Sequence, residues 1–246
     1  PVSCTRYGKG KKPVKAAELI KYAANAFLAT KITFINEIAN LCDAIGCDVH
    51  DVARGIGMDK RIGGKFLHPG PGYGGSCFPK DTRALTTVAD QFDVETRIVD
   101  AVIEANEFQR QKMILKIQKL IGDLNGKNIG VLGLSFKPET DDMRESPAID
   151  IIKEMVAQGA KIKAFDPVAM EEAKHYLPNI EYAENEYDAI KDADALVIIT
   201  EWNQFRALNM NEVKKLLKTP KIADLRNIYE PEDMRKMGFE YVGVGR

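Results

Sequence analysis

The architecture of the second half of the chain is set by Ile129-Gly130-Val131-Leu132-Gly133-Leu134. It is a short, continuous apolar run, which is the pattern of a strand that is buried on both faces of a parallel sheet. The hydrophobic period changes just before it, at Asn125-Gly126, from the long spacing of helices to short strand-like runs. We therefore predict that a sheet begins here.

Strands and helices alternate from this run to the end of the sequence. Ser146 and Pro147 open the first helix, as N-cap and first-turn residue, and Gly159 ends it. Further strands are expected at 161–165, 195–200, 222–225 and, as an edge, 241–242, separated by helices at 170–176, 211–217 and 231–236. Such alternation predicts a Rossmann-like α/β unit with helices on both faces of a parallel sheet.

Two cations are expected at the carboxyl ends of these strands, where such sheets bind their ligands. The first turn reads Gly130-x-x-Gly133 and lacks the phosphate fingerprint, so we assign no dinucleotide to this unit. Lys137 and Arg226 favour a sugar nucleotide, because ammonium and guanidinium groups both bind phosphate oxygens. On position alone, two surface charges are an equally good interpretation.

The first half of the chain is predicted to be entirely helical. Residues 16–45 contain neither glycine nor proline, and Gly46 then supplies a stop. The apolar residues that recur at helical spacing in this segment are Ile20, Ala24, Phe27, Ile35, Ile38, Leu41 and Ile45. A helix of this length spans about 45 Å. Because so much of its surface is apolar, we expect it to be heavily buried, in part against another subunit. Further helices are expected at 48–54, with Asp48 as the cap, at 79–92 and at 96–121.

Residues 70–81, Gly-Pro-Gly-Tyr-Gly-Gly-Ser-Cys-Phe-Pro-Lys-Asp, are the part of the sequence most suggestive of chemistry. Pro79 suits the first turn of a helix, which places Cys77 at the helix N-terminus, where the dipole favours the thiolate. Lys80 adds a positive charge nearby. A nucleophilic cysteine is one interpretation, and a small buried hydrophobe beside a glycine-rich turn is the other. We judge the G-x-G-x-x-G match in this loop false, because prolines interrupt it and no convincing strand precedes it.

Composition narrows the class of protein. The 246 residues are enough for two ordinary domains, and 35 basic against 36 acidic residues give no sign of a nucleic-acid partner. We expect no membrane span and no metal site, since no apolar stretch is long enough and the four cysteines and three histidines show no ligand spacing. The cysteine usage fits a reducing cytoplasm.

Lys21 and Asn25 are four residues apart and so share one face of the long helix, where they are either functional or simply an exposed polar stripe.

Four motifs favour a function. They are Ala17-Glu18-Leu19-Ile20-Lys21-Tyr22-Ala23-Ala24-Asn25, Phe66-Leu67 with Gly72 to Asp81, Gly133 to Pro138 with Thr140 to Pro147, and Asp224-x-Arg226-Asn227. In this order, across nearly the whole chain, they resemble the UDP-glucose/GDP-mannose dehydrogenase family. Tyr73, Ser76 and Phe78 are most similar to the branch that converts UDP-glucose to UDP-glucuronate.

The resemblance implies a four-electron oxidation of a primary alcohol to a carboxylate with two NAD⁺ and one water. Cys77 would capture the aldehyde and carry a thiohemiacetal and then a thioester. Lys21 would stabilise the oxyanion, Asn25 would hold the reacting oxygen or water, and Asp81 would orient water or Lys21 or act as a base.

The resemblance also implies which residues bind the ligands. Implied substrate contacts are Arg61, Phe66, His68, Tyr73, Gly74, Phe136, Lys137 and Arg226, with Arg61 reaching across from a neighbouring subunit. Lys80 and Arg144 match positions that touch NAD. A homodimer formed through the helix at 16–45 is expected, with a higher oligomer left open.

The expected domains are a linker or remnant at 1–12, a helical central dimerisation domain at 13–124 with the cysteine loop, and a Rossmann-like UDP-sugar-binding domain at 125–246. Family members begin with an NAD-binding domain. We expect it to be missing here, since Pro1 stands where a start methionine would, and we expect no turnover from this chain alone.

Three other functions compete with this assignment. A related dehydrogenase could act on GDP-mannose or UDP-N-acetylmannosamine. A cysteine hydrolase would need a histidine base, for which His68, nine residues before Cys77, is the nearest candidate. A non-catalytic module would bind sugar nucleotide and dimerise without chemistry.

Overall fold

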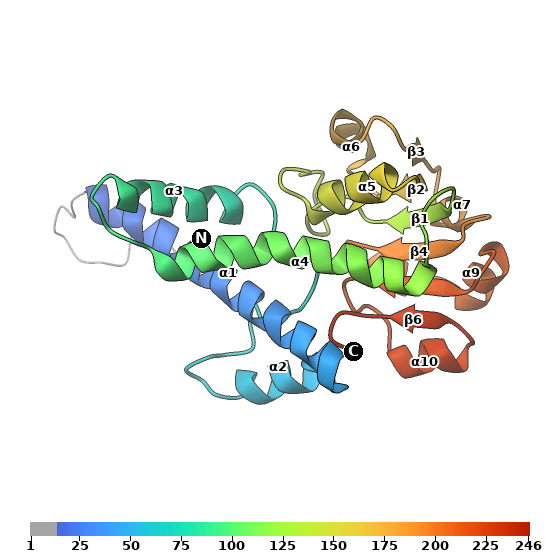
Figure 1. Ribbon diagram of the computed structural model, residues 1–246, viewed down its shortest axis with the longest axis horizontal. Helices are drawn as coiled ribbons and strands as arrows, with labels where there is room; N and C mark the ends of the chain where they lie inside the picture. The colour runs from blue at the N-terminus through green and yellow to red at the C-terminus, as the bar shows by residue number, and fades with distance from the viewer. Residues whose placement is uncertain (1–13) are drawn as a thin grey trace.

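The computed structural model describes residues 14–246, so the linker expected at 1–12 lies outside the described residues. Helices fill the first half of the described chain, as predicted: α1 (Val14–Ile45), α2 (Val49–Gly57), α3 (Phe78–Asp90) and α4 (Arg97–Ile121). The long helices α1 and α4 cross, and α3 lies beside α1 (Figure 1). Asp48 caps α2 by accepting the N–H of His50 at 2.7 Å, which confirms the predicted cap.

A six-stranded parallel sheet makes up the second half of the described chain. Its strands are β1 (Asn128–Leu132), β2 (Lys161–Phe165), β3 (Glu181–Tyr182), β4 (Ala195–Ile198), β5 (Lys221–Asp224) and β6 (Glu240–Val242). The order β3-β2-β1-β4-β5-β6 is that of a doubly wound Rossmann sheet, which confirms the predicted fold class.

The connecting helices are α5 (Pro147–Ala157), α6 (Met170–Tyr176), α7 (Glu186–Ile190), α8 (Asn203–Arg206), α9 (Met210–Leu216) and α10 (Pro231–Lys236). The sequence did not predict β3, α7 or α8. All three are five residues or shorter, which is too short for either period to show.

Alternation along the strands divides the interior into two cores. Ile129 and Val131 of β1 face one cluster, together with α4, α5 and α6. Leu132 faces the other cluster, on the side of α7, α9 and α10. Gly130 points toward the second face, where a Cβ would lie 2.6 Å from the Ala189 carbonyl oxygen of α7. The missing side chain therefore lets α7 lie directly against β1.

Helix α4 belongs to the sheet as much as to the helical half. Its residues Met113 and Ile117 are fully buried in the same cluster as Ile35 of α1 and Val131 of β1. Lys221 of β5 also donates to the Leu120 carbonyl at 2.8 Å, at the end of α4. One continuous core therefore joins the segments that we assigned to separate domains.

The prediction that α1 is heavily buried is wrong for the single chain. Ile35 is fully buried and Ile38 is partly buried. Phe27 is 67% exposed, Leu41 53% and Ile45 66%, and Ile20 is exposed too. The helix has more apolar surface than α2, α3 and α4 can cover, because they pack along only part of its circumference.

No helix within the described residues is long and apolar enough to cross a membrane.

We predict that Gly133→Ala will destabilise the fold far more than Gly126→Ala. Both glycines have positive φ, +90° and +73°, so each alanine incurs a strain of about 1 kcal/mol. A Cβ at Gly133 would also lie 2.5 Å from Thr200, and relieving that overlap costs roughly a further 1–3 kcal/mol. Gly126 has nothing within 4 Å of that position and is the matched control. Equal free energies of unfolding in urea for the two variants would contradict the steric role given to Gly133.

Candidate active site

Three of the four residues expected to be catalytic contact one another. Asp81, in the first turn of α3, is completely buried. Asn25 donates from Nδ2 to Asp81 Oδ2 at 2.6 Å, and Lys21 Nζ lies 3.5 Å from the same oxygen. Lys21 and Asn25 therefore both contact Asp81 from one face of α1, although the Lys21 side chain is 57% exposed.

The second oxygen of Asp81 lacks a hydrogen bond. Oδ1 is buried without a hydrogen-bond partner among the described residues, and the Lys80 ammonium lies 3.9 Å away. A buried carboxylate oxygen with nothing to accept is costly, so this atom is suited to receive a donor from a bound molecule.

Cys77 is the N-cap residue of α3, as the sequence predicted, and it is exposed. The alternative of a small buried hydrophobe is therefore wrong. The Asp81 N–H donates to the Cys77 carbonyl at 2.9 Å, which sets the thiol and the buried carboxylate one helical turn apart. Cys42, by contrast, is buried, and burial raises the pKa of its thiol to about 11. Cys77 is thus much better suited than Cys42 to act as a nucleophile.

Buried amides of the long helices hold the glycine-rich loop before Cys77. Asn106 Oδ1 accepts the Tyr73 N–H at 2.8 Å and its Nδ2 donates to the Tyr73 carbonyl at 3.1 Å. Asn36 accepts the Gly70 N–H at 2.8 Å, and Gln109 donates to the Gly70 carbonyl at 2.9 Å. Sequence reasoning missed these amides. The available signal was the presence of polar amides on otherwise apolar helix faces.

The glycines of the loop allow close contact with the second half of the chain. The Gly75 N–H donates to the Arg144 carbonyl at 2.9 Å, and a Cβ at Gly75 would lie 2.6 Å from the Phe136 ring. A Cβ at Gly74 would collide with the Glu145 carbonyl. The loop lies between helices and not at a strand-to-helix turn, so the G-x-G-x-x-G match is false, as predicted.

Arg226 and Phe136 meet beside this loop. Arg226 Nη2 donates to the Phe136 carbonyl at 3.2 Å, and a Cβ at Gly70 would lie 3.1 Å from Arg226 Nη1. Arg226 Nε is already engaged, by the Ile199 carbonyl at 2.8 Å and Glu201 at 3.0 Å, and its side chain is 17% exposed. Lys137 is exposed, with Nζ 5.3 Å from the centroid of the Phe136 ring. The structure thus gathers these three predicted substrate residues at the carboxyl ends of β1 and β5.

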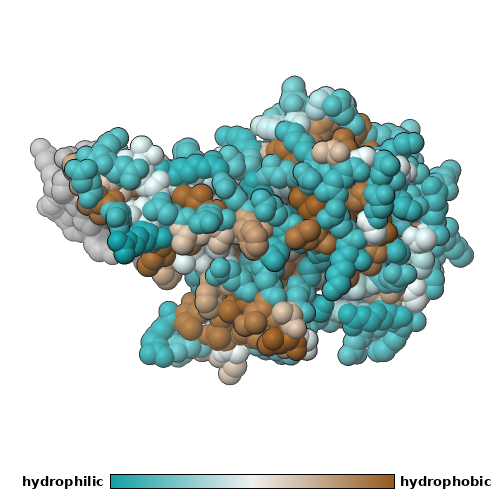
Figure 2. All heavy atoms as spheres, viewed as in Figure 1, coloured by the Kyte–Doolittle hydropathy of each residue, from teal (hydrophilic) through white to brown (hydrophobic). Residues whose placement is uncertain are grey.

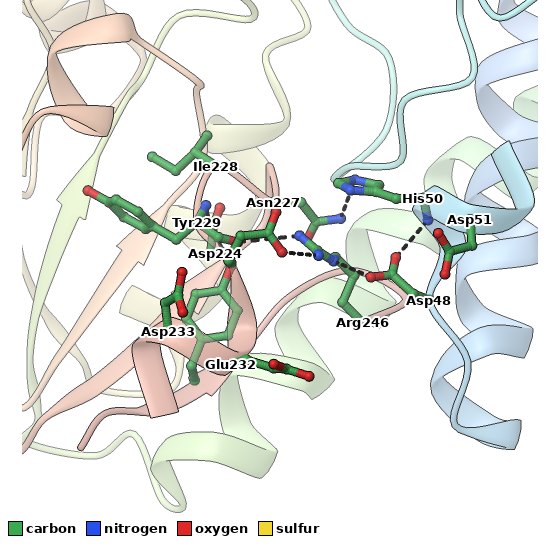
Figure 3. Close-up of polar contacts among 12 residues, drawn as sticks. Asp48, His50, Asp51, Asp224, Asn227, Ile228, Tyr229, Glu232, Asp233 and Arg246 are labelled. Atoms are coloured by element: carbon green, nitrogen blue, oxygen red, sulfur yellow. Dashed lines mark hydrogen bonds and ion pairs between the residues drawn. The ribbon is translucent and has the colours of Figure 1, made fainter. Parts of the chain in front are cut away.

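A buried polar network fixes the loop that carries Arg226. Asp224, at the end of β5, accepts the Arg226 N–H at 3.0 Å and the Tyr241 hydroxyl at 2.8 Å, and burial raises its pKa. Figure 3 shows Arg246 between this region and Asp48, which its Nε contacts at 2.9 Å. Asn227 uses its amide to pair with the Val244 backbone at 2.8 and 2.9 Å. The start of α2 is therefore tied to the loop after β5.

The remaining predicted substrate residues are more scattered. The Tyr73 ring is buried against Ala29 and Val102, so it supports the loop from within. Phe66 lies edge-on to Phe78 at 6.2 Å between ring centroids, and φ at Phe66 is +65°. His68 and His50 line a cavity of about 440 Å³ beside α2.

Arg61 forms no hydrogen bond or ion pair with this group of residues. Its side chain is 90% exposed and paired with Asp59 at 2.6 Å. Its expected role toward a neighbouring subunit stays a prediction.

The two predicted cofactor residues are exposed cations. The Lys80 side chain is 70% exposed, and Arg144 is 64% exposed while its guanidinium holds Asp142 at 2.9 Å. That contact lowers the pKa of Asp142. The role of these two cations toward NAD stays a prediction.

The second half of the chain does not fit a dinucleotide at the usual position of a Rossmann sheet. Asp166 follows β2, where a ribose-binding carboxylate would stand. It is completely buried and accepts the N–H groups of Leu134 at 2.8 Å, Ser135 at 3.1 Å and Ala169 at 2.9 Å. The Val168 N–H at 3.0 Å, the Ser135 hydroxyl at 3.1 Å and Trp202 Nε1 at 3.2 Å also donate to it. This carboxylate holds the first turn in place and is closed to a ribose.

Within residues 14–246, no group of three or more histidine, cysteine or acidic side chains is arranged to hold a metal ion.

Comparison with known proteins matches both halves of the chain to one family. Residues 15–108 match the central domain of the UDP-glucose/GDP-mannose dehydrogenase family, and residues 130–231 match its UDP-binding domain. The UDP-glucose 6-dehydrogenase of Rhizobium meliloti is 52% identical over 233 residues, which is 94% of this chain and 53% of that protein. The chain spans about half the length of the curated relatives it matches.

Solved structures agree. A UDP-glucose dehydrogenase from Pyrobaculum islandicum superposes with a TM-score of 0.84 at 35% identity, over 94% of this chain and 51% of that one. An NDP-N-acetyl-D-galactosaminuronic acid dehydrogenase from Methanosarcina mazei superposes with a TM-score of 0.83 at 29% identity, over 94% and 51%.

We predict that Glu145→Gln will weaken the fold above pH 5 and have no effect in acid. Arg83 holds Glu145 at 2.9 Å and keeps its pKa below the ordinary 4.5. A depressed carboxylate pKa stabilises the folded state above the unfolded value, and that contribution disappears as the pH falls through the folded value. Because the pair is half-exposed, the difference should be at most about 1 kcal/mol.

Urea unfolding of both proteins between pH 3 and 7 measures this difference. Glu95→Gln is the control, because Glu95 and Arg97 are both largely exposed. If the difference in free energy of unfolding between wild type and Glu145→Gln persisted unchanged at pH 3, it would contradict the role of the ion pair.

Proposed function

Because the chain belongs to the UDP-glucose/GDP-mannose dehydrogenase family, we propose that it supplies the nucleophile and the sugar-nucleotide site of an NAD-dependent UDP-glucose 6-dehydrogenase. The observation that carries this proposal is the exposed Cys77 thiol at the start of α3, one turn from the Asp81–Asn25–Lys21 cluster. A thiol, an ammonium and a buried carboxylate are the groups that covalent capture of an aldehyde requires.

Cys77 would act by attacking the C6 aldehyde of the oxidised sugar. A bond forms between Sγ and the carbon while the carbonyl electron pair moves to oxygen, and the Lys21 ammonium stabilises that oxyanion. Loss of hydride from the resulting thiohemiacetal leaves a thioester, which water hydrolyses to the carboxylate and the free thiol. Bound NAD⁺ supplies the hydride acceptor for both oxidations. The unpartnered Oδ1 of Asp81 is suited to accept a proton from the attacking water, with Asn25 holding the other oxygen in place.

The UDP part of the substrate would lie at the carboxyl ends of β1 and β5. The exposed Lys137 ammonium and the free edge of the Arg226 guanidinium would contact the diphosphate, beside the Phe136 ring. Phe66, His68 and Gly74 would approach the sugar from the glycine-rich loop, and Arg61 would come from a second copy. Lys80 and Arg144 would contact the NAD phosphates. We place the enzyme in the cytoplasm.

Substrate choice within the family is the nearest alternative. Tyr73, Ser76 and Phe78 favour UDP-glucose, while a GDP-mannose or UDP-N-acetylmannosamine enzyme would share the same cysteine chemistry. Initial rates of NADH formation with the three sugar nucleotides distinguish them. If a complete dehydrogenase that contains this chain bound UDP-glucose without forming any NADH, that result would instead identify a binding module. The hydrolase alternative loses support, because His68 lies with His50 beside α2 and forms no hydrogen bond to Cys77.

In a complete dehydrogenase that contains this chain, we expect Cys77→Ser to lower the rate of UDP-glucuronate formation by about a thousandfold or more, because a serine hydroxyl is a far weaker nucleophile without its own base. UDP-glucose affinity, measured by calorimetry, should change little. Cys47→Ser is the control and should keep full activity. Normal turnover by the Cys77 variant would remove this residue from the mechanism.

We also propose that α1 forms the interface of a homodimer. Its exposed residues Ile20, Phe27, Phe34 and Leu41 recur every seven positions, which is the repeat of helices that pack along their length. Figure 2 shows hydrophobic atoms gathered along the part of α1 near α2. A second copy would cover this stripe and complete the burial expected from the sequence.

Phe34→Glu should therefore convert the dimer to a monomer at micromolar concentration, as measured by sedimentation equilibrium, because a charge would be buried in the interface. Val168→Glu, at an exposed apolar position in the α/β half, should leave the mass unchanged. A wild-type chain that sediments as a monomer would overturn the proposed dimer.

A further inference from the structure

We propose that Arg110 is a positioning residue that fixes the cysteine loop to the α/β half of the chain. This inference rests on the proposed function, in which Cys77 must meet a sugar whose nucleotide is held by Lys137 and Arg226. Arg110 lies in α4 and belongs to none of the sequence motifs considered above. Its side chain is only 12% exposed.

One guanidinium joins three separate segments. Arg110 Nη1 pairs with Asp150 of α5. Its Nη2 donates to the Tyr73 carbonyl at 3.3 Å and to the Glu145 carbonyl at 3.4 Å. The residue therefore contacts the glycine-rich loop, the segment before α5 and α5 itself.

The contact with Tyr73 lies next to the closest approach of the two halves. Gly74 packs on the Glu145 carbonyl, and the Gly75 N–H donates to Arg144. Cys77 follows within two residues. A shift of Tyr73 against Glu145 would therefore change the distance between the thiol and a sugar held over Phe136, and such misplacement lowers reactivity more than affinity.

Arginine suits this position for a geometric reason. Its planar fork presents several N–H donors in fixed directions, so it can hold a carboxylate and two carbonyls at once. Lysine could keep the charge pair with Asp150 but would hold the two carbonyls less well. The neighbouring Arg83–Glu145 pair also bridges the halves, yet both partners are more than a third exposed, so solvent weakens it.

The first test needs no ligand. Hydrogen–deuterium exchange of the peptide spanning residues 70–77 is measured in the wild-type chain, Arg110→Gln and Arg110→Lys. We expect about tenfold faster exchange in Arg110→Gln, since the loop loses charge-assisted hydrogen bonds, and a smaller increase with lysine. Peptides from β1 and β4 should not change. Arg97→Gln, which removes an exposed arginine of the same helix, is the control.

The second test uses UDP-glucose as the probe. The rate at which iodoacetamide alkylates Cys77 is measured on the peptide that contains this residue, with and without UDP-glucose. The protection by UDP-glucose is then compared with the affinity for UDP-glucose measured by calorimetry. We expect Arg110→Gln to bind UDP-glucose within about threefold of wild type yet to lose most of the protection. If the wild-type chain does not bind UDP-glucose and UDP-glucose does not protect Cys77, the proposed function fails. The hydrogen–deuterium exchange experiment still tests the role of Arg110 in that case.

Unchanged exchange over 70–77 in Arg110→Gln would overturn the inference. So would a parallel loss of binding and protection, because that result indicates a general structural role. Should Arg110→Gln fail to fold, Asp150→Asn removes the charged partner from α5 alone and is measured in the same two ways, with the same expected pattern.

Discussion

The candidate site depends on the close approach of the glycine-rich loop to the segment between β1 and α5. Gly74 and Gly75 lie against the Glu145 carbonyl and the Phe136 ring at distances that exclude a Cβ. This contact fixes the position of Cys77 relative to the carboxyl ends of the strands, where Lys137 and Arg226 gather. Buried amides on α1 and α4 hold the loop from the other side. The loop that leads to the Cys77 thiol is thus held on one side by the segment between β1 and α5 and on the other by α1 and α4.

Much of this arrangement could be predicted from the sequence, because its signals are local. The apolar run at Ile129, the Ser146-Pro147 cap and the helical period of α1 depend only on neighbouring residues. The helix start at Cys77 follows from Pro79 in the same way. The motif match added Lys21, Asn25 and Asp81, and the structure joins them in one cluster.

Other features depend on residues that are distant in sequence and were not predicted. Asn36, Asn106 and Gln109 have no motif around them, and only the folded chain brings their amides to the loop. The hydrogen bonds from backbone N–H groups to Asp166 likewise form only when β1 and β2 are paired. Phe27 and Leu41 are exposed in the single chain, because a helical period shows that a face is apolar without showing what covers it.

The shared core around α4 has a consequence for modularity. Met113 and Ile117 fill the same cluster as β1 and α5, so α4 serves as one of the layers that shield the sheet from water. A Rossmann unit that began after residue 124 would lack α4, and the apolar side chains that pack against α4 would be exposed to water. The two matched family segments therefore share one hydrophobic core, and recombination that keeps this core intact would have to carry α4 along with the strands that it covers.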